Sequence, residues 1–308
     1  MLAGAAAVAA EPASTASARP PVGRFSLSAS GEYSAGGYGG EAETRVFYLP
    51  FTARYRHLDL SLTPYAHDHL ELRLTLAYVR VEGPGDVVLS GGMPIARRRG
   101  AGDGGTGSGG MPGSGGSGSG APMSSAVVEG ETRVVDGFGD IFAGARYTID
   151  PPPGRMLPSI DLAGTVKIPT ASASDGLGTG KVDVTLWSEL WLPVGDFSLR
   201  SGGGYRFMGG EDLSNRWLAS AGCGYRFGDS LSAGLDYDFR EAAVTGVENA
   251  HELVPYVSLR LGRHVRLEPY AVAGLSDASP DWGAGVTLRF SVSVVGGVRP
   301  SPRDPGAR

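Results

Sequence analysis

Apolar and polar residues alternate, position by position, along most of this 308-residue chain. In the clearest stretch, Trp282 to Phe290, the even-numbered residues are Trp, Ala, Val, Leu and Phe, and the odd-numbered ones are Gly, Thr and Arg. A β-strand points successive side chains to opposite faces, so the stretch predicts a strand with one apolar and one polar face. The 50 glycines are spread too densely to leave room for a helical bundle.

Twelve segments share this pattern, and their connections alternate between short and long. The segments are 24–34, 44–64, 69–82, 138–149, 158–168, 182–192, 197–208, 216–227, 231–240, 252–261, 264–274 and 282–290. The short connections are 66–69, 150–154, 193–196, 228–229 and 262–263; the long ones are 35–43, 83–137, 169–181, 209–215, 241–251 and 275–281. Tight turns at one end and long loops at the other are typical of outer-membrane β-barrels.

The second segment departs from the pattern. Its apolar phase changes between Tyr55 and Leu58, which predicts either a bulge in one long strand or an extra turn. We favour the bulge, because an extra turn would spoil the even strand count.

Charges of both signs, interleaved with glycine, occupy the face opposite the apolar one. Such a face suits a wet or salt-bridged lumen and not a dry core, so we expect these residues to line the lumen and to set any selectivity. They are Glu71, Arg73, Asp140, Arg146, Asp161, Lys167, Asp183, Glu189, Arg200, Arg206, Arg226, Asp236, Asp238, Arg240, Arg260, Arg266, Glu268 and Arg289. Replacing Arg206 or Arg260 with glutamate is then expected to shift ion selectivity.

Aromatic residues of the apolar face fall at two levels if odd-numbered strands run towards the long loops. The long-loop level holds Tyr33, Tyr78, Tyr205, Phe207, Trp217, Tyr237, Phe239 and Trp282; the short-turn level holds Phe25, Tyr147, Phe197, Tyr225, Phe227 and Phe290. Two such belts are expected of rings at the two headgroup levels of a bilayer. In a bilayer a sheet cannot leave an edge, so it must close.

We therefore expect an all-β, transmembrane, antiparallel up-and-down β-barrel of about twelve strands over residues 23–290. It would lie in the outer membrane of a Gram-negative bacterium, in contact with its lipid and with both termini in the periplasm. A soluble β-sandwich is the alternative fold. The net charge of −5 argues against nucleic-acid binding.

Three flanking or inserted segments stand apart from the strands. Residues 1–22 read as a residual signal peptide without its basic start, or as a disordered tail. The long loop 83–137 contains a Gly/Ser-rich stretch at 97–120 that predicts flexibility, either as a lid or, as we favour, as a surface insertion. Residues 291–308 form a C-terminal tail.

Signals for chemistry are weak. The DGLGTGK stretch at 175–181 fails as a phosphate-binding loop, because Asp175 stands where the motif needs glycine and Val182 where it needs Ser or Thr. A single His67-Asp68-His69 in a predicted turn is a poor metal site. No inward histidine lies near an inward serine such as Ser258. We expect no enzyme, metal or cofactor, although a lipid-hydrolysing barrel remains an alternative.

Some motifs resemble a known family. Gly137-Phe138-Gly139-Asp140 opens a strand, Lys167-Ile168-Pro169-Thr170 ends the next, and Asp175-Gly176-Leu177-Gly178-Thr179-Gly180 follows in the loop, with Gly204-Tyr205 beyond. Over about 75 residues the chain resembles the "MetA-pathway of phenol degradation" group of outer-membrane transporters. The resemblance implies a channel often linked to uptake of aromatic or hydrophobic compounds, and it transfers no catalytic residues.

The expected function is thus passive, porin-like passage of small molecules of unknown identity. A non-transporting structural or adhesive barrel with a plugged lumen is the alternative. Phe290 also resembles the terminal aromatic that the barrel assembly machinery reads during biogenesis. Because residues follow it, either that signal tolerates a tail, or Ser291 to Val295 extend the strand; with a tolerated tail, deleting 291–308 leaves assembly intact.

Overall fold

The computed structural model describes residues 23–40, 42–57, 67–84, 87–90, 93–96, 132–152, 156–210 and 213–294. Its strands are β1 (Gly23–Gly36), β2 (Thr44–His57), β3 (His67–Pro84), β4 (Val87–Ser90), β5 (Met93–Ala96), β6 (Thr132–Phe138), β7 (Ile141–Asp150), β8 (Ser159–Ile168), β9 (Asp183–Val194), β10 (Phe197–Phe207), β11 (Arg216–Arg226), β12 (Leu231–Arg240), β13 (Ala250–Leu261), β14 (Val265–Gly274) and β15 (Trp282–Val294). In these ranges no helix has the length and apolarity needed to cross a bilayer.

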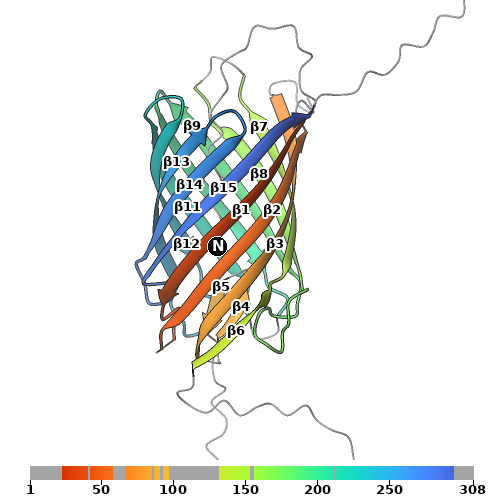
Figure 1. Ribbon diagram of the computed structural model, residues 1–308, viewed down its shortest axis with the longest axis vertical. Helices are drawn as coiled ribbons and strands as arrows, with labels where there is room; N and C mark the ends of the chain where they lie inside the picture. Colours follow the sequence, from red (N-terminus) through yellow and green to blue (C-terminus); the bar gives the residue numbers. More distant parts are fainter. Residues whose placement is uncertain are drawn as a thin grey trace, which may run out of the picture.

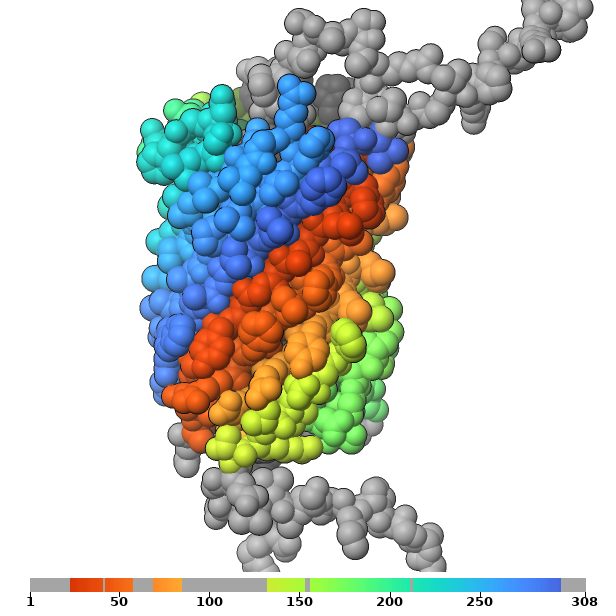
Figure 2. Space-filling model, viewed as in Figure 1, coloured from red at the N-terminus to blue at the C-terminus, as the bar shows by residue number. Residues whose placement is uncertain are grey.

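The described strands form a closed antiparallel barrel of twelve strands with one extra strand, β6. From β7 to β15 each strand pairs with the next one in sequence, β3 pairs with β2 and β7, and β4 and β5 form a separate two-stranded sheet. Because β1 pairs with both β2 and β15, the first and last strands close the barrel. Strands run obliquely around one cylinder (Figure 1). In the space-filling view β1, in red, lies between blue β15 and orange β2 (Figure 2). The expectation of an all-β barrel of about twelve strands is confirmed.

The two ends of the barrel differ. The end that carries the connections β7–β8, β9–β10, β11–β12 and β13–β14 is called here the turn end, and the opposite end is the loop end. At the β9–β10 connection Gly195 and Asp196 alone join the strands, and Gly195 has a φ of 63°, a conformation that glycine adopts without strain.

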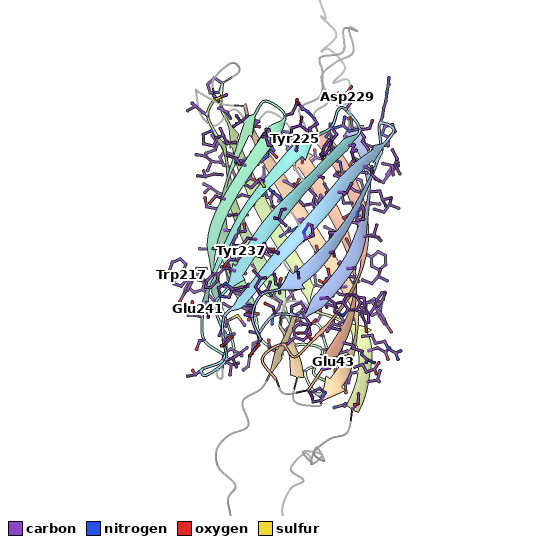
Figure 3. All side chains as sticks on the ribbon, turned by 90° about the vertical axis from the view of Figure 1, so that its left-hand side faces the viewer. Glu43, Trp217, Tyr225, Asp229, Tyr237 and Glu241 are labelled. Atoms are coloured by element: carbon purple, nitrogen blue, oxygen red, sulfur yellow. The ribbon has the colours of Figure 1, made fainter. Side chains whose placement is uncertain are left out.

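The outer surface is apolar, and its aromatic side chains gather near both ends. Trp217 and Tyr237 lie towards the loop end, whereas Tyr225 lies towards the turn end (Figure 3). Ring contacts connect neighbouring strands within each level, as between Tyr205 and Trp217 (4.8 Å) and between Phe197 and Tyr225 (4.7 Å). The alternation seen in the sequence thus maps onto an outward apolar face and an inward polar one.

Part of the segment expected to be one long loop is in fact strand. Residues 87–90 and 93–96 form the β4–β5 hairpin, and β6 pairs with β3 from Tyr78 to Pro84, beside the place where β7 pairs with it. β6 and β7 are one strand course interrupted at Gly139 and Asp140, so the strand expected at 138–149 begins at Ile141 instead. Glycine and aspartate in this course obscured its alternation. The stretch 97–120 lies outside the described residues.

Two further boundaries differ from expectation. Residues 67–69, expected in a turn, belong to β3, where they pair with the end of β7. The barrel also continues beyond residue 290, because β15 runs to Val294 and its last residues pair with Gly23 to Ser26. The alternative in which the strand extends past Phe290 is therefore the one observed. The phase change at Tyr55–Leu58 reaches past His57 into residues outside the described ranges, as do residues 1–22.

Candidate functional site: the barrel interior

The interior reverses the usual distribution of charge in a protein. The side chain of Lys167 is only 2% exposed, whereas Leu288, on the outer face, is 50% exposed. Strand alternation produces this arrangement, because each inward residue is flanked by outward neighbours. Buried charges need partners, so the interior can be described by its ion pairs.

At the loop end, Lys167 forms the centre of a buried ionic group. Its Nζ lies 2.9 Å from Asp183 Oδ2 and 3.4 Å from Asp140 Oδ2, and it donates to Thr179 Oγ1 at 2.6 Å. The two carboxylates also accept backbone N–H groups, Asp140 from Ala171 (3.0 Å) and Asp183 from Gly209 (3.1 Å). The group therefore ties β8, β9, the break before β7 and two loops together.

This ionic group explains the family-like motifs. Gly178 packs so closely that a Cβ there would lie 3.0 Å from the Asp140 carboxylate, and Thr170 Oγ1 accepts the N–H of Ile141 at 3.0 Å. Asp140, Lys167, Thr170, Gly178 and Thr179 thus belong to one unit, although the sequence separates them into three motifs. Their role in the structure is to hold the loop 169–182 against the barrel wall.

Two other ion pairs lie on β10, β12 and β13. Arg240 binds Glu252 through two hydrogen bonds, one of them 2.9 Å long, and both side chains are buried. Arg200 pairs with Asp236, and its guanidinium lies 5.4 Å from the centre of the Tyr256 ring. Such bidentate and stacked arrangements are characteristic of arginine.

Apolar side chains also point inward at the loop end. Val46 and Tyr48 of β2 and Ala77 and Val79 of β3 pack against Tyr38, Ala171 and Leu177 from the loops; we call these seven residues the mouth cluster. Burial in this loop raises the pKa of the Tyr38 hydroxyl, which donates to Ser34 Oγ at 2.7 Å. Loops fold inward here and cover part of the inner wall.

The Tyr38 backbone is strained. Its φ is 50° and that of Gly39 is 84°, while Gly40 N–H donates to Gly37 O at 2.8 Å, a geometry like that of a type I′ turn. A bulky residue rarely adopts positive φ, so the burial of the ring and its hydrogen bond offset a backbone cost.

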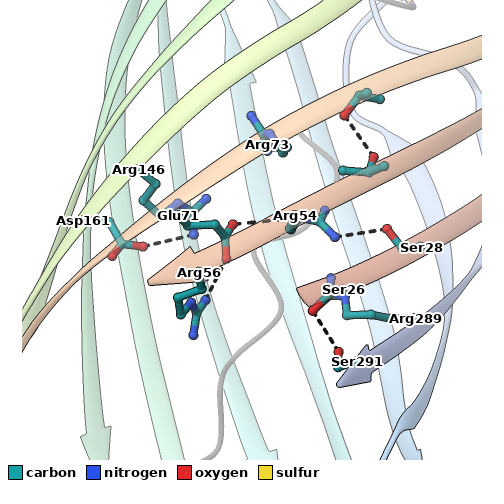
Figure 4. Close-up of polar contacts among 12 residues, drawn as sticks. Ser26, Ser28, Arg54, Arg56, Glu71, Arg73, Arg146, Asp161, Arg289 and Ser291 are labelled. Atoms are coloured by element: carbon teal, nitrogen blue, oxygen red, sulfur yellow. Dashed lines mark hydrogen bonds and ion pairs between the residues drawn. The ribbon is translucent and has the colours of Figure 1, made fainter. Parts of the chain in front are cut away.

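In the turn-end half, arginines dominate the inner wall (Figure 4). Arg56 Nη2 lies 2.9 Å from Glu71 Oε2, and Arg54 Nε lies 3.9 Å from the other oxygen of that carboxylate. Arg146 lies 3.1 Å from Asp161. Hydroxyl pairs lie beside them on the same wall, including Ser26 of β1 with Ser291 of β15 (2.9 Å).

All but one of the charged residues expected on the polar face are buried or half-buried. The exception is Arg226, which is 45% exposed at the end of β11 and pairs with Asp196 of the β9–β10 turn. Asp140 lies between strands and not within one. The remaining residues therefore lie at inner-wall positions and form several separate ion pairs, and Arg226 lies at the turn-end rim.

Sequence reasoning missed other inward charges. They are Arg24, Glu32, Arg54, Arg56, Arg216 and Glu252, all on the same strand face as the expected residues. The alternation itself would have found them, because each lies two or four positions along its strand from another inward polar residue. Arg54 and Arg56 lie beside the apparent phase change, and the others lie near strand ends.

Within the described residues, no three His, Cys, Asp or Glu side chains come together as a metal site. The rings of His251 and His264 contact the Tyr237 hydroxyl and the Ser291 carbonyl. Among the described side chains, no serine hydroxyl hydrogen-bonds a histidine ring.

No protein-family model matches the sequence, and no curated protein matches it. Among solved structures, the chain is similar to the COG4313 outer membrane channel from Pseudomonas putida F1, with a TM-score of 0.57 and 11% identity over 92% of this chain and 100% of that one. The β domain of the Bordetella autotransporter BrkA (TM-score 0.48, 12% identity, 89% and 100% covered) and the Ralstonia pickettii toluene transporter TbuX (0.41, 8%, 90% and 90%) are more distant. At these identities the likeness to the channel concerns the fold, and the two weaker ones add nothing to it.

Proposed function

We propose that the protein is an outer-membrane channel through which small molecules pass passively along a charged lumen. The observation that carries this proposal is the reversal of polarity between the two faces of a closed barrel. Its outer face exposes large apolar side chains such as Leu72 and Leu288, and its inner face holds Lys167, Arg240 and Glu252. Water would penalise the outer face, whereas hydrocarbon would accept it.

The two aromatic levels support a bilayer setting, because amphipathic rings favour the headgroup regions. In the proposed orientation the loop end faces outward and the turn end faces the periplasm, as do both termini. The barrel assembly machinery would insert the chain, with Phe290 near the end of its last strand as part of the signal. The fold likeness to an outer membrane channel supports a channel. The sequence resemblance to phenol-degradation transporters favours small, aromatic or hydrophobic solutes.

A second candidate is a non-transporting barrel, and the mouth cluster favours it. Seven inward apolar residues pack together at the loop end, where loops fold over the wall. If this packing closes the lumen, the barrel has a structural or adhesive role.

Heat-modifiable gel migration of the protein refolded in detergent is the first test. A difference between boiled and unboiled samples establishes a closed, detergent-stable barrel, and single-channel conductance then decides between the two candidates. Measurable, ohmic conductance supports the channel. A well-folded protein without conductance contradicts it and supports the plugged barrel, and solubility in plain buffer without any heat shift contradicts both.

Tyr38→Asn sharpens this test. Asparagine tolerates positive φ, so the turn keeps its backbone while the mouth cluster loses a ring. We expect higher conductance with unchanged heat-modifiable migration, because removal of the ring widens the mouth. Tyr38→Phe, which keeps the ring and loses only the bond to Ser34, is the matched control and should leave conductance near wild type. Equal conductance in Tyr38→Asn and wild type would show that this ring does not limit passage.

A further inference from the structure

Five guanidinium groups gather on the inner wall of the turn-end half. They belong to Arg54 and Arg56 of β2, Arg73 of β3, Arg146 of β7 and Arg289 of β15, and we call them the arginine belt (Figure 4). Neighbouring strands β15, β1, β2, β3 and β7 hold them side by side.

The belt has more positive charge than its acidic partners neutralise. Glu71 serves both Arg54 and Arg56, and Asp161 serves Arg146. Arg289 reaches Glu268 only at 3.9 Å, and Arg73 donates to the neutral Thr165 hydroxyl at 3.2 Å. Five cations thus share three carboxylates, which leaves the belt with a net positive charge.

The strand register places arginines directly opposite one another in this half. Arg54 stands opposite Arg73, and Arg266 stands opposite both Arg260 and Arg289. Directly opposite residues have Cβ atoms about 4.5–5.5 Å apart, and like charges there destabilise a sheet.

The same wall also pairs opposite charges. Glu71 stands opposite both Arg56 and Arg146. Among the described strands of this half, acids oppose each other at Asp161 and Glu189. In this half, arginine therefore stands opposite arginine more often than acid stands opposite acid.

Burial makes this excess costly. The side chains of Arg56 and Arg289 are less than one-fifth exposed, and the Nε atom of each is buried without a hydrogen-bond partner. A buried donor without a partner costs about 1–3 kcal/mol, and more when it is charged. An anion with two or three oxygens would accept such N–H groups and neutralise the excess charge together.

We propose that the arginine belt binds the carboxylate or phosphate group of a small solute and makes the lumen selective for anions. The proposal rests on the proposed channel function, whose solute class it narrows. Guanidinium groups match the paired oxygens of carboxylate and phosphate, and a charged cleft with low-dielectric walls concentrates counter-ions.

The deciding measurement in a conducting barrel is the reversal potential across a planar bilayer under a KCl gradient. We expect wild type to prefer chloride over potassium, and the double variant Arg73→Gln/Arg289→Gln to lose that preference several-fold. Arg45→Gln is the matched control, because Arg45 is 51% exposed outside the lumen and pairs with Glu43. Arg73→Lys keeps the charge, so we expect it to retain more of the preference for chloride than Arg73→Gln does. A wild-type channel without chloride preference, or a double variant that keeps it, overturns the proposal while leaving passive passage intact.

Thermal stability tests the same site in a barrel that does not conduct. Benzoate and inorganic phosphate are added to folded protein in detergent, and benzyl alcohol serves as the uncharged counterpart of benzoate. We expect at least one anion, but not the alcohol, to raise the temperature at which the unboiled band converts, and the double variant to lose the rise. Such a result supports an anion-binding site even if the protein has shown no conductance. Absence of any rise with either anion, or an equal rise in the double variant, refutes the site in that case.

Discussion

Lys167 illustrates what the barrel requires of a single residue. The chain has two lysines, Lys167 and Lys181, in opposite environments. Lys167 is enclosed by Asp140 and Asp183, whereas Lys181 is exposed in the loop 169–182, two residues before β9 begins. Charge alone therefore does not decide the role of a lysine here, whereas the carboxylates around it do.

Lys167→Met should destabilise the barrel, because it leaves two buried carboxylates without their shared cation. Removing one partner from a buried ion pair costs about 3–5 kcal/mol. The measurement is the temperature at which the heat-modifiable band converts, with Lys181→Met as control. A conversion temperature equal to that of the control would mean that the loop 169–182 is held by other contacts.

Neighbouring strands fit together through glycines that receive aromatic rings. Tyr270 of β14 stands opposite Gly285 of β15, and a Cβ on Gly285 would overlap the ring, whose hydroxyl donates to Glu32. Tyr256 covers Gly234 of β12 in the same way. Gly234 and Gly285 are therefore places where a ring from the neighbouring strand occupies the space that a side chain would need.

Gly285→Val should displace the Tyr270 ring and cost about 1–3 kcal/mol, as overpacking usually does. Gly203→Val is the matched control: Gly203 lies on the outer face of β10, where a Cβ has only a backbone oxygen 3.8 Å away. Valine suits an exposed apolar strand position, so this control should be neutral or slightly stabilising. Both variants are compared by band conversion temperature, and equal values would argue against the ring contact.

At the scale of the element, the sequence predicts the strands whose two faces alternate cleanly. It does not predict contacts that depend on which strands pair. The strand over Trp282–Phe290 follows from its residues alone, because each face is unmixed. β6 escaped prediction, because Gly137 and Asp136 break the pattern and its partner strand β3 is distant in sequence, with pairs from Pro84–Thr132 to Tyr78–Phe138. Register between strands is not revealed by a single sequence. It brings Asp140 and Asp183 to Lys167, and it places Arg54 opposite Arg73.

The barrel closes at one seam, where its first strand β1 pairs with its last strand β15. Their pairs run from Gly23 with Val294 to Ala35 with Trp282. Truncation after Phe290 removes the pairs of Gly23 to Ser26 and the bond between Ser26 and Ser291, so we expect a lower conversion temperature. Truncation after Val294 keeps every described pair and is the control. Equal stability of the two truncated proteins would show that the seam needs no residue beyond Phe290.

The same seam has a consequence for connectivity. Because Gly23 stands opposite Val294, the two ends of the barrel lie side by side at the turn end. A short linker between them, with new ends cut at the turn Gly228–Asp229, would give a circularly permuted chain in which every strand keeps both neighbours. The permutant would keep the order of strands around the cylinder and change their order along the chain. Its assembly in cells would show whether insertion into the membrane requires a particular last strand or only a barrel that can close.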